Sequence, residues 1–316
     1  MRYLPRRIST GLMTGIPVLF MLLACSPQDS HDAAMPVAQP VVMPIMTRPV
    51  PDELVNMGYA GIHDDVVTLS GGRWEGEPYE AGAASRPVVG LVEDFYMSGD
   101  LDGKSPDEAV AMLWETSGGS GVYSYVAVVA RRDGKPVNIG TALVGDRVQL
   151  RAGRIRDKHI ELDLIQQGPK DAACCPTETV TRVWAMGAEG LEEGAAQNKG
   201  TFSIADLEGQ EWLLVGSAVP EGLEITLAVT QGRVAGQSAC NRYFGSFTTG
   251  DMPGEISLGQ IGSTRMACPP PVMELEDRYL QSLANVTGYG FLNGKLAMTW
   301  QQDGASKMLL FTLLDQ

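Results

Sequence analysis

The sequence predicts an α+β protein with two β-rich domains, each a mainly antiparallel sheet with one packed helix. Two observations predict this class. Short apolar segments follow one another at hairpin spacing in both halves of the chain. Each half also holds one segment in which apolar residues recur at helical spacing. A sheet covered by one helix is the simplest architecture that buries these apolar faces.

The chain begins with the features of a signal peptide at residues 1–24. Three arginines precede an apolar run that ends in Leu22-Leu23-Ala24-Cys25. This pattern is typical of a secretory signal rather than a membrane span, and it resembles the lipobox of bacterial lipoproteins. The resemblance implies acylation of Cys25, palmitate included, and several acyl chains hold a protein to a membrane more firmly than one. Ser26 replaces the Asp of the inner-membrane retention pattern, which implies a lipid anchor in the cell outer membrane and periplasmic domains.

Charge and composition limit the classes of partner. Without residues 1–24 the chain has 21 Lys and Arg against 38 Asp and Glu, a net charge of −17. Such a field repels nucleic acid and anionic headgroups, so we expect no nucleic-acid partner and contact with the membrane through the acyl chains. Residues 25–60 are Pro-rich without an apolar period and are predicted to form an extended tether.

Residues 61–187 are predicted to form the first domain. Its helix is expected to begin at Ser105-Pro106-Asp107-Glu108, a capping box with proline at the first helical position, and to carry Ala109, Met112 and Leu113 on one face. The strands expected after this helix are 123–130, 137–144, 147–151, 159–165 and 179–184, with Asp133-Gly134 as the first hairpin turn.

A possible cation site precedes this predicted helix. Asp100, Asp102 and Asp107 lie in a segment that resembles aspartate-rich calcium loops, in which carboxylates converge on a hard cation. Lys104 stands where such a loop has a ligand oxygen, which opposes binding. The alternative interpretation is a turn that caps the helix.

Cys174 and Cys175 are adjacent in the sequence. They can form a vicinal disulfide, pair with other cysteines or stay reduced, whereas redox centres more typically have the C-x-x-C spacing. A cysteine nucleophile needs a base, and His159 is the candidate in this domain. The alternative function for the first domain is therefore a thiol- or carboxylate-dependent enzyme, or a calcium or redox sensor.

Parts of the first domain are similar to a domain of uncharacterised bacterial envelope proteins. The segments that carry this resemblance are Gly99-Asp100, 118–121, 134–138, 145–148 and 174–177. The resemblance implies a folded unit and no particular function. Residues 188–206 mix Ala, Gly and Glu and are predicted to be a linker.

Residues 207–316 carry a series of motifs in a characteristic order. The motifs are Gly209-Gln210-Glu211-Trp212, 232–236, Cys240-Asn241-Arg242-Tyr243-Phe244-Gly245, 263–269 and Glu274. Together they resemble the META domain (HslJ-like) family. This resemblance implies a compact, mostly β unit with a packed helix, and a broad role in envelope stress.

Local patterns support that fold independently. A helix is expected after Pro269–Pro271, with Leu275, Tyr279, Leu283 and Val286 on one side. A type I′ turn at Asn293-Gly294 is expected to join strands at 289–292 and 295–300, and a strand at 308–313 completes the sheet.

The four cysteines after Cys25 allow three pairings, which the sequence alone does not rank. Because Cys240 and Cys268 lie in the segments that define the family, the resemblance favours their pairing, with two buried thiols as the alternative. Closing this loop adds about 3 to 4 kcal/mol. Asn241 and Arg242 are either turn and surface residues or part of a polar network beneath the hairpins.

The motifs of common enzymes are absent from the sequence. It contains no recognisable Ser-His-acid set, Walker loop or dinucleotide fingerprint. We therefore expect a non-catalytic, membrane-anchored lipoprotein of the bacterial cell envelope, with no cofactor unless calcium binds. Its expected partner, besides the membrane, is an envelope protein or a small ligand.

Overall fold

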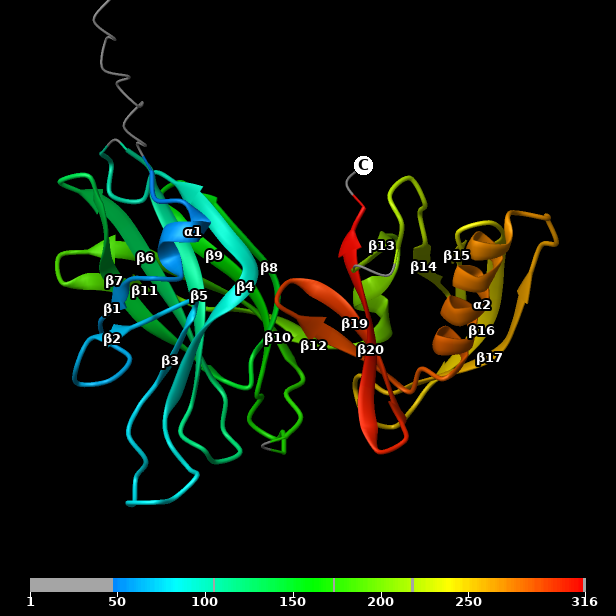
Figure 1. Cartoon of the computed structure of the whole chain (residues 1–316), viewed down its shortest axis with the longest axis horizontal. Helices are drawn as coiled ribbons and strands as arrows, with labels where there is room; N and C mark the ends of the chain where they lie inside the picture. The colour runs from blue at the N-terminus through cyan, green and yellow to red at the C-terminus, as the bar shows by residue number, and fades with distance from the viewer. Residues whose placement is uncertain (1–47, 105, 173, 217–218, 315–316) are drawn as a thin grey trace, which may run out of the picture. The chain divides into compact units, whose positions relative to one another are not determined.

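The computed structural model describes residues 48–104, 106–172, 174–216 and 219–314. The predicted signal peptide, Cys25 and the tether up to residue 47 lie outside the described residues. The described part forms mainly antiparallel sheets with few helices, divided between an N-terminal and a C-terminal sheet region (Figure 1). In this described part, no helix combines the length and the apolar character needed to cross a membrane.

The N-terminal region contains two larger sheets. The first has the strand order β3-β4-β5-β6-β7, formed by Arg73–Glu75, Val88–Gly99, Glu108–Thr116, Tyr123–Arg132 and Lys135–Asp146. The second has the order β11-β10-β9-β8, and β12 also pairs with β10. Its strands in chain order are β8 (Gln149–Arg156), β9 (His159–Gln166), β10 (Glu178–Gly187), β11 (Gly190–Glu193) and β12 (Gln197–Thr201).

A hydrophobic core lies between these two sheets. In β9, Ile160, Leu162 and Leu164 are fully buried and alternate with partly exposed acidic residues, as expected for a strand with one face in a core. They belong to the same cluster as Val110 and Val126 of the first sheet. Strands β4 and β7 of the first sheet contact β8 and β11 of the second. The two sheets therefore pack face to face.

A second cluster covers the other face of the first sheet. It includes residues from α1 (Pro51–Leu54), β1 (Gly58–Tyr59) and β2 (Val67–Thr68). Leu54 and Tyr59 are buried, and the Tyr59 hydroxyl donates to the carbonyl of Leu54 at 2.9 Å. The folded part of the chain therefore begins before residue 60, where the sequence predicts the end of the tether.

The prediction of a helix that begins at Ser105 is wrong, because residues 108–116 form β5 at the centre of the first sheet. Ala109, Ala111 and Leu113 pack in the outer cluster, while Val110 and Met112 pack between the sheets. A strand buried on both faces reads as a continuous apolar run, which periodicity does not separate from a buried helix. The first domain therefore has no long packed helix in its described residues.

The segment 188–206, expected to be a linker, also differs from the prediction. It contains β11, β12 and most of the 3-10 helix η1 (Ile204–Leu207). Phe202 and Leu207 are buried in the core of the C-terminal region, together with Ile165 of β9. The connection is therefore hydrogen-bonded, packed structure.

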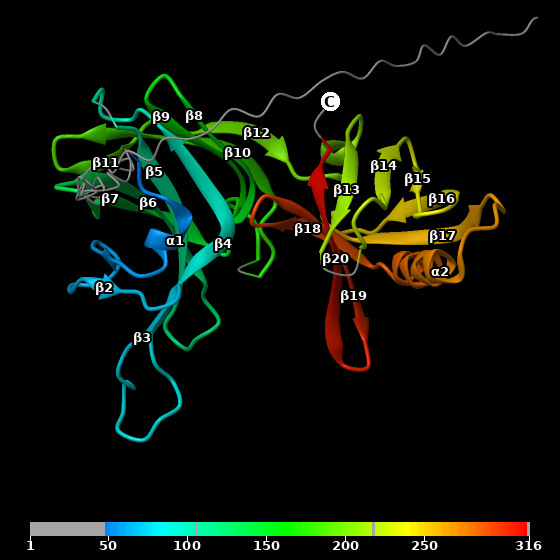
Figure 2. The same cartoon turned by 45° about the horizontal axis from the view of Figure 1, so that its top comes forward.

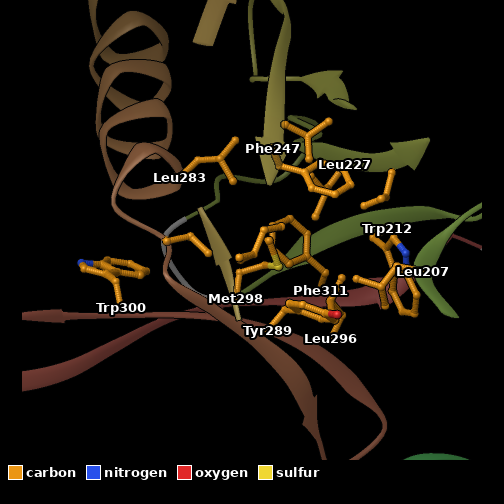
Figure 3. Close-up of a cluster of buried hydrophobic side chains, with 14 of the residues drawn as sticks. Leu207, Trp212, Leu227, Phe247, Leu283, Tyr289, Leu296, Met298, Trp300 and Phe311 are labelled. Carbon is orange, nitrogen blue, oxygen red and sulfur yellow. The ribbon is translucent and has the colours of Figure 1, made fainter. Parts of the chain in front are cut away.

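The C-terminal region is built on one sheet with the order β17-β16-β15-β14-β13-β20-β19-β18. Its strands are β13 (Glu211–Val215), β14 (Thr226–Thr230), β15 (Arg233–Gln237), β16 (Arg242–Thr249), β17 (Ile256–Ser263), β18 (Gly288–Leu292), β19 (Lys295–Gln302) and β20 (Ala305–Leu313). The two edges approach each other where Tyr289 N donates to the Gly254 carbonyl at 2.7 Å. The curved sheet encloses the core shown in Figure 3.

Two local predictions for this region are confirmed. The helix α2 (Pro270–Ala284), labelled in Figure 2, follows β17 in the chain. It buries Leu275, Tyr279 and Leu283 along one face. Asn293 and Gly294 have φ values of 52° and 80°, the left-handed conformation that a type I′ turn requires. They join β18 to β19.

Candidate functional site

The structure brings together a carboxylate cluster, but with a different membership from the predicted one. One carboxylate oxygen from each of Asp100, Asp102 and Glu108 lies within 4.8 Å of the others, whereas Asp107 is exposed and outside the group. Glu108, expected to cap a helix, accepts from the backbone N–H groups of Leu101 at 2.9 Å and Asp102 at 3.4 Å. It therefore closes the turn that precedes β5.

Basic side chains surround this cluster. Asp102 pairs with Lys104 at 3.1 Å and with Arg132 at 3.4 Å, and Lys158 lies 3.7 Å from Asp100. Burial raises the pKa of Asp102, but the hydrogen bonds and charge of Lys104 and the bond from Arg132 outweigh it and hold that pKa below its usual value. Burial raises the pKa of Glu108. Carboxylates that protein cations already neutralise are poor ligands for a hard cation.

The structure separates the cysteines of the first domain from their candidate base. Cys174 and Cys175 form a disulfide in the loop that joins the end of β9 to the start of β10. His159 begins β9 and is exposed, with Nδ1 2.7 Å from the Asp157 carbonyl. Because β9 has eight residues, its two ends are about 23 Å apart. His159 is therefore not placed to act on either sulfur.

The sulfur atoms of Cys240 and Cys268 lie at disulfide distance, with the Cα atoms 6.2 Å apart. This is the pairing that the family resemblance favours. Asn241 follows Cys240 and is buried. Its backbone N–H and its Nδ2 donate to the Glu276 carboxyl at 2.7 and 2.9 Å. The network interpretation of Asn241 is thus the observed one, whereas Arg242 is exposed.

This network joins α2 to the strand connections. Asn241 Oδ1 accepts from Met266 N at 2.7 Å and from the Thr264 hydroxyl at 2.8 Å, and the Ser238 hydroxyl donates to Glu276 at 2.8 Å. These groups bond one another and are buried or part-buried, so we assign them a structural role. The sequence motif points to Glu274, which is exposed, and not to Glu276, which is 3% exposed.

A groove with a volume of about 630 Å³ lies between strands of the two regions. Residues of β4, β8, β9, β10 and β12 form one side, and residues of β13, β20 and the β18–β19 hairpin form the other. We name it the Trp212 groove, after the most buried large side chain that lines it. Its volume is in the range of pockets that hold small ligands, and such pockets are frequent at domain boundaries.

Direct hydrogen bonds fix the two sides of the Trp212 groove. Gly294 N donates to the Leu150 carbonyl at 2.9 Å, and Phe291 N donates to Gln149 Oε1 at 2.8 Å. The Arg151 guanidinium lies 5.2 Å from the centre of the Phe291 ring, a cation–π contact. The β18–β19 hairpin is thereby held against β8.

Trp212 is one of two tryptophans of the described residues with a buried, unpartnered Nε1, and the other, Trp184, does not line the groove. The side chain is 4% exposed and packs with its ring centre 5.9 Å from that of Phe291 (Figure 3 shows its place at the core). Its Nε1 is buried and has no hydrogen-bond partner among the described residues. A buried donor normally has a partner, so an orphaned one calls for an explanation such as a water molecule or a ligand.

Most charged side chains of the groove are already paired. Lys295 lies 2.8 Å from Asp94, and Arg151 lies 3.0 Å from Asp206 at the edge of the groove. Asp163 accepts from the Thr181 hydroxyl at 2.6 Å and from Arg154. Burial raises the pKa of Asp163, but these two partners outweigh it and hold the pKa below its usual value. Asp163 is therefore a weak base near neutral pH.

Sequence reasoning missed this groove. The motif Gly209-Gln210-Glu211-Trp212 identifies the start of a domain but gives no sign that Trp212 lines a groove together with strands of another sheet. The Asn293-Gly294 turn signal, likewise, predicts a hairpin and not its contact with β8. The available signals were the Asn293-Gly294 turn and a tryptophan in a family motif, Trp212, to which no role had been assigned.

Comparisons with known proteins assign a family to the C-terminal region. No curated protein matches the chain. Among solved structures, the chain is similar to the NMR structure of a protein from Burkholderia xenovorans, with 31% sequence identity, coverage of 35% of this chain and 86% of that chain, and a TM-score of 0.29. The model of the META domain family matches residues 200–313. Residues 200–313 are therefore a META domain, and this part of the chain belongs to the META domain family.

Proposed function

We propose that this chain is an acylated lipoprotein of the bacterial cell envelope that binds a small ligand in the Trp212 groove and does not transform it. The META domain supplies one side of the groove, and the sheets of the N-terminal region supply the other. The proposal depends mainly on Trp212, which lines a groove of ligand-sized volume and whose buried Nε1 has no hydrogen-bond partner among the described residues. A bound acceptor atom would complete that hydrogen bond.

We infer binding rather than catalysis from the ionisable groups of the groove. A general base works best when its pKa lies near the working pH. The only side-chain carboxyls on the groove's described walls are Asp94 and Asp163; the first pairs with Lys295, and Thr181 and Arg154 hold the pKa of the second low. These groups organise the groove and are poorly suited to move protons.

The membrane anchor is a proposal that depends on Cys25 and the lipobox alone. It is tested by metabolic labelling with palmitate in cells that express the chain or its Cys25→Ser variant. We expect label in the first protein, its loss in the variant, and release of the variant from the membrane fraction. Membrane association of an unlabelled variant would contradict the anchor.

The binding part is tested with ¹⁵N-labelled protein that lacks residues 1–25. The chain has five tryptophans, and the Trp212→Phe variant identifies the Trp212 indole N–H signal. We expect a low-molecular-mass envelope extract to shift that signal and to leave the signal of Trp300, whose Nε1 lies 3.4 Å from Gln302 Oε1, in place. Equal shifts of all indole signals, or none, would contradict a specific site.

A further inference from the structure

Apart from the ammonium of Lys199 at the rim, the hydrogen-bonding groups that remain available in the Trp212 groove are uncharged. Besides Trp212 Nε1, the groove is lined by the amides of Gln210 and Asn293 and by the hydroxyl of Thr312. These three side chains make no hydrogen bond within the residues that the structure describes. Amides and hydroxyls offer both donors and acceptors. They suit a ligand whose own groups both donate and accept.

The charges of the groove favour an uncharged ligand. Lys295 pairs with Asp94, Arg151 with Asp206, and Asp163 with Arg154. Lys199 is the one lining cation without a carboxylate partner among the described residues. Any other ionic contact of a ligand would have to break one of these pairs and replace it with an interaction of similar strength. Lys199 at the rim donates to Gln197 at 3.0 Å. Because its side chain is exposed, water solvates its charge and weakens its attraction for an anion.

The backbone hydrogen bonding of the groove walls disfavours an extended peptide as the ligand. Peptides that add to a sheet bind a strand edge with free N–H and C=O groups. Strands β9, β10, β13 and β20 each have partner strands on both sides. The wall strands β8, β12 and β18 are edge strands of their sheets. Strand β8 and the β18–β19 hairpin hold each other through the Gly294–Leu150 and Phe291–Gln149 bonds, which leaves the outer edge of β12 at the rim. Most of the wall therefore presents side chains to a ligand rather than a free strand edge.

Aromatic and apolar surfaces complete the groove. Phe95, Met97 and Phe291 line it beside Trp212, and the first two pack on Gly153, where an added Cβ would lie only 3.0 to 3.1 Å from them. A saccharide presents hydroxyl or amide groups at its rim and C–H groups on its faces. This combination matches neutral polar groups set among aromatic rings.

We propose that the Trp212 groove binds a neutral saccharide, with Trp212 Nε1, Gln210, Asn293 and Thr312 as its hydrogen-bonding groups. This inference rests on the proposed function of the groove as a binding site. The ligand class follows from which groups are free and which are paired. Lys199 and the ion pairs are expected to contribute little to the affinity.

The test is a titration of the ¹⁵N-labelled protein without residues 1–25, with triacetylchitotriose and maltotriose as probes. We expect at least one of them to shift the Trp212 indole signal with a Kd of about 1 mM or tighter, and the Kd to change less than about two-fold between low and high salt. Trp212→Phe and Asn293→Gly should each weaken binding about five-fold, the loss of one neutral hydrogen bond. Because Trp212→Phe removes the indole signal, its Kd is read from the backbone amide signals of Phe291 and Gly294, which lie in the groove wall. Glycine keeps the left-handed conformation at position 293.

Lys199→Gln and Trp300→Phe are the matched controls, and both should bind the probe as the parent protein does. The remaining indole signals report whether each variant is folded. If neither saccharide shifts the Trp212 signal at about 10 mM, which exceeds the expected Kd, the saccharide inference is overturned. A shift with an acetylated neutral tripeptide amide instead would overturn it and leave the binding function standing. Strong salt dependence that Lys199→Gln abolishes would point to an anion and also overturn it.

Discussion

Replacement of Glu276 by alanine tests the buried network of the META domain. In the native domain its carboxyl accepts from the backbone N–H of Asn241 at 2.7 Å, from Asn241 Nδ2 at 2.9 Å and from the Ser238 hydroxyl at 2.8 Å. Ser238 keeps a second acceptor, the Asn241 carbonyl, and Asn241 Nδ2 keeps a long contact to the Met266 carbonyl. The substitution therefore orphans one backbone donor fully and one side-chain donor in part.

The expected cost follows from those orphaned groups. A buried donor without a partner costs about 1 to 3 kcal/mol, so the Glu276→Ala variant should lose about 3 kcal/mol of unfolding free energy. Near the unfolding midpoint of a domain of this size, this loss lowers Tm by about 12 °C. Glu276→Gln keeps one acceptor oxygen but turns an amide N–H₂ toward the donors, and we expect about half the loss.

The assay is thermal and urea unfolding of the protein without residues 1–25, followed by tryptophan fluorescence. Glu274→Ala is the matched control, because Glu274 lies two residues away on α2 and is exposed; its effect should stay within about 0.5 kcal/mol. A loss for Glu276→Ala within about 1 kcal/mol of that control would refute the assignment of the network as a stabilising element.

Three further outcomes are expected. Replacement of Cys240 and Cys268 by alanine should lower the free energy of urea unfolding by about 3 to 4 kcal/mol, because their disulfide closes a loop with a sequence separation of 28. Replacement of the adjacent Cys174 and Cys175 should lower it by about 1 kcal/mol. Equal losses would contradict the loop-entropy argument. The loss of unfolding free energy in Asp163→Asn should be largest above about pH 4 and should shrink as the pH falls toward 2. The reason is that the lowered native pKa of Asp163 stabilises the folded state only while the carboxyl is ionised. A loss that grows in acid would contradict the direction of this pKa shift. Calcium at about 1 mM should leave Tm unchanged. Basic side chains already neutralise the carboxylates of Asp100 and Asp102, namely Lys104, Arg132 and Lys158. A clear rise of Tm with calcium would support the calcium-site interpretation.

The sequence is most informative where local chemistry decides the structure. The helical spacing of Leu275, Tyr279 and Leu283 places the buried face of α2, and Asn293-Gly294 specifies the β18–β19 turn. These signals act over a few residues, so no knowledge of distant partners is needed to interpret them.

The wrong predictions concern segments whose structure is decided by contacts with residues distant in the sequence. The capping pattern at Ser105–Glu108 and the apolar run after it fit a helix, but sheet partners on both sides and cores on both faces make residues 108–116 a strand. Glu108 then closes the turn at Leu101 and Asp102 instead. A tertiary environment of this kind overrides local propensity.

The Trp212 groove could not be predicted from the sequence for a related reason. Its walls come from strands separated by more than a hundred residues, as in the bond between Phe291 N and Gln149 Oε1. Predicting residues 188–206 as a linker also hid the packing of Phe202 and Leu207 into the META core. Only the family motifs around Cys240 and Cys268 extended sequence reasoning to tertiary structure, through the disulfide pairing.

The proposed function depends most on Trp212 Nε1 as a hydrogen-bond donor to the ligand. A crystal structure of the protein without residues 1–25 in complex with triacetylchitotriose tests this role most directly. We predict a ligand oxygen at hydrogen-bond distance, about 2.8 to 3.1 Å, from Trp212 Nε1, between the β8 side and the β18–β19 hairpin. A ligand bound on another surface, or a Trp212 Nε1 that donates to a protein group in the complex, would contradict the account.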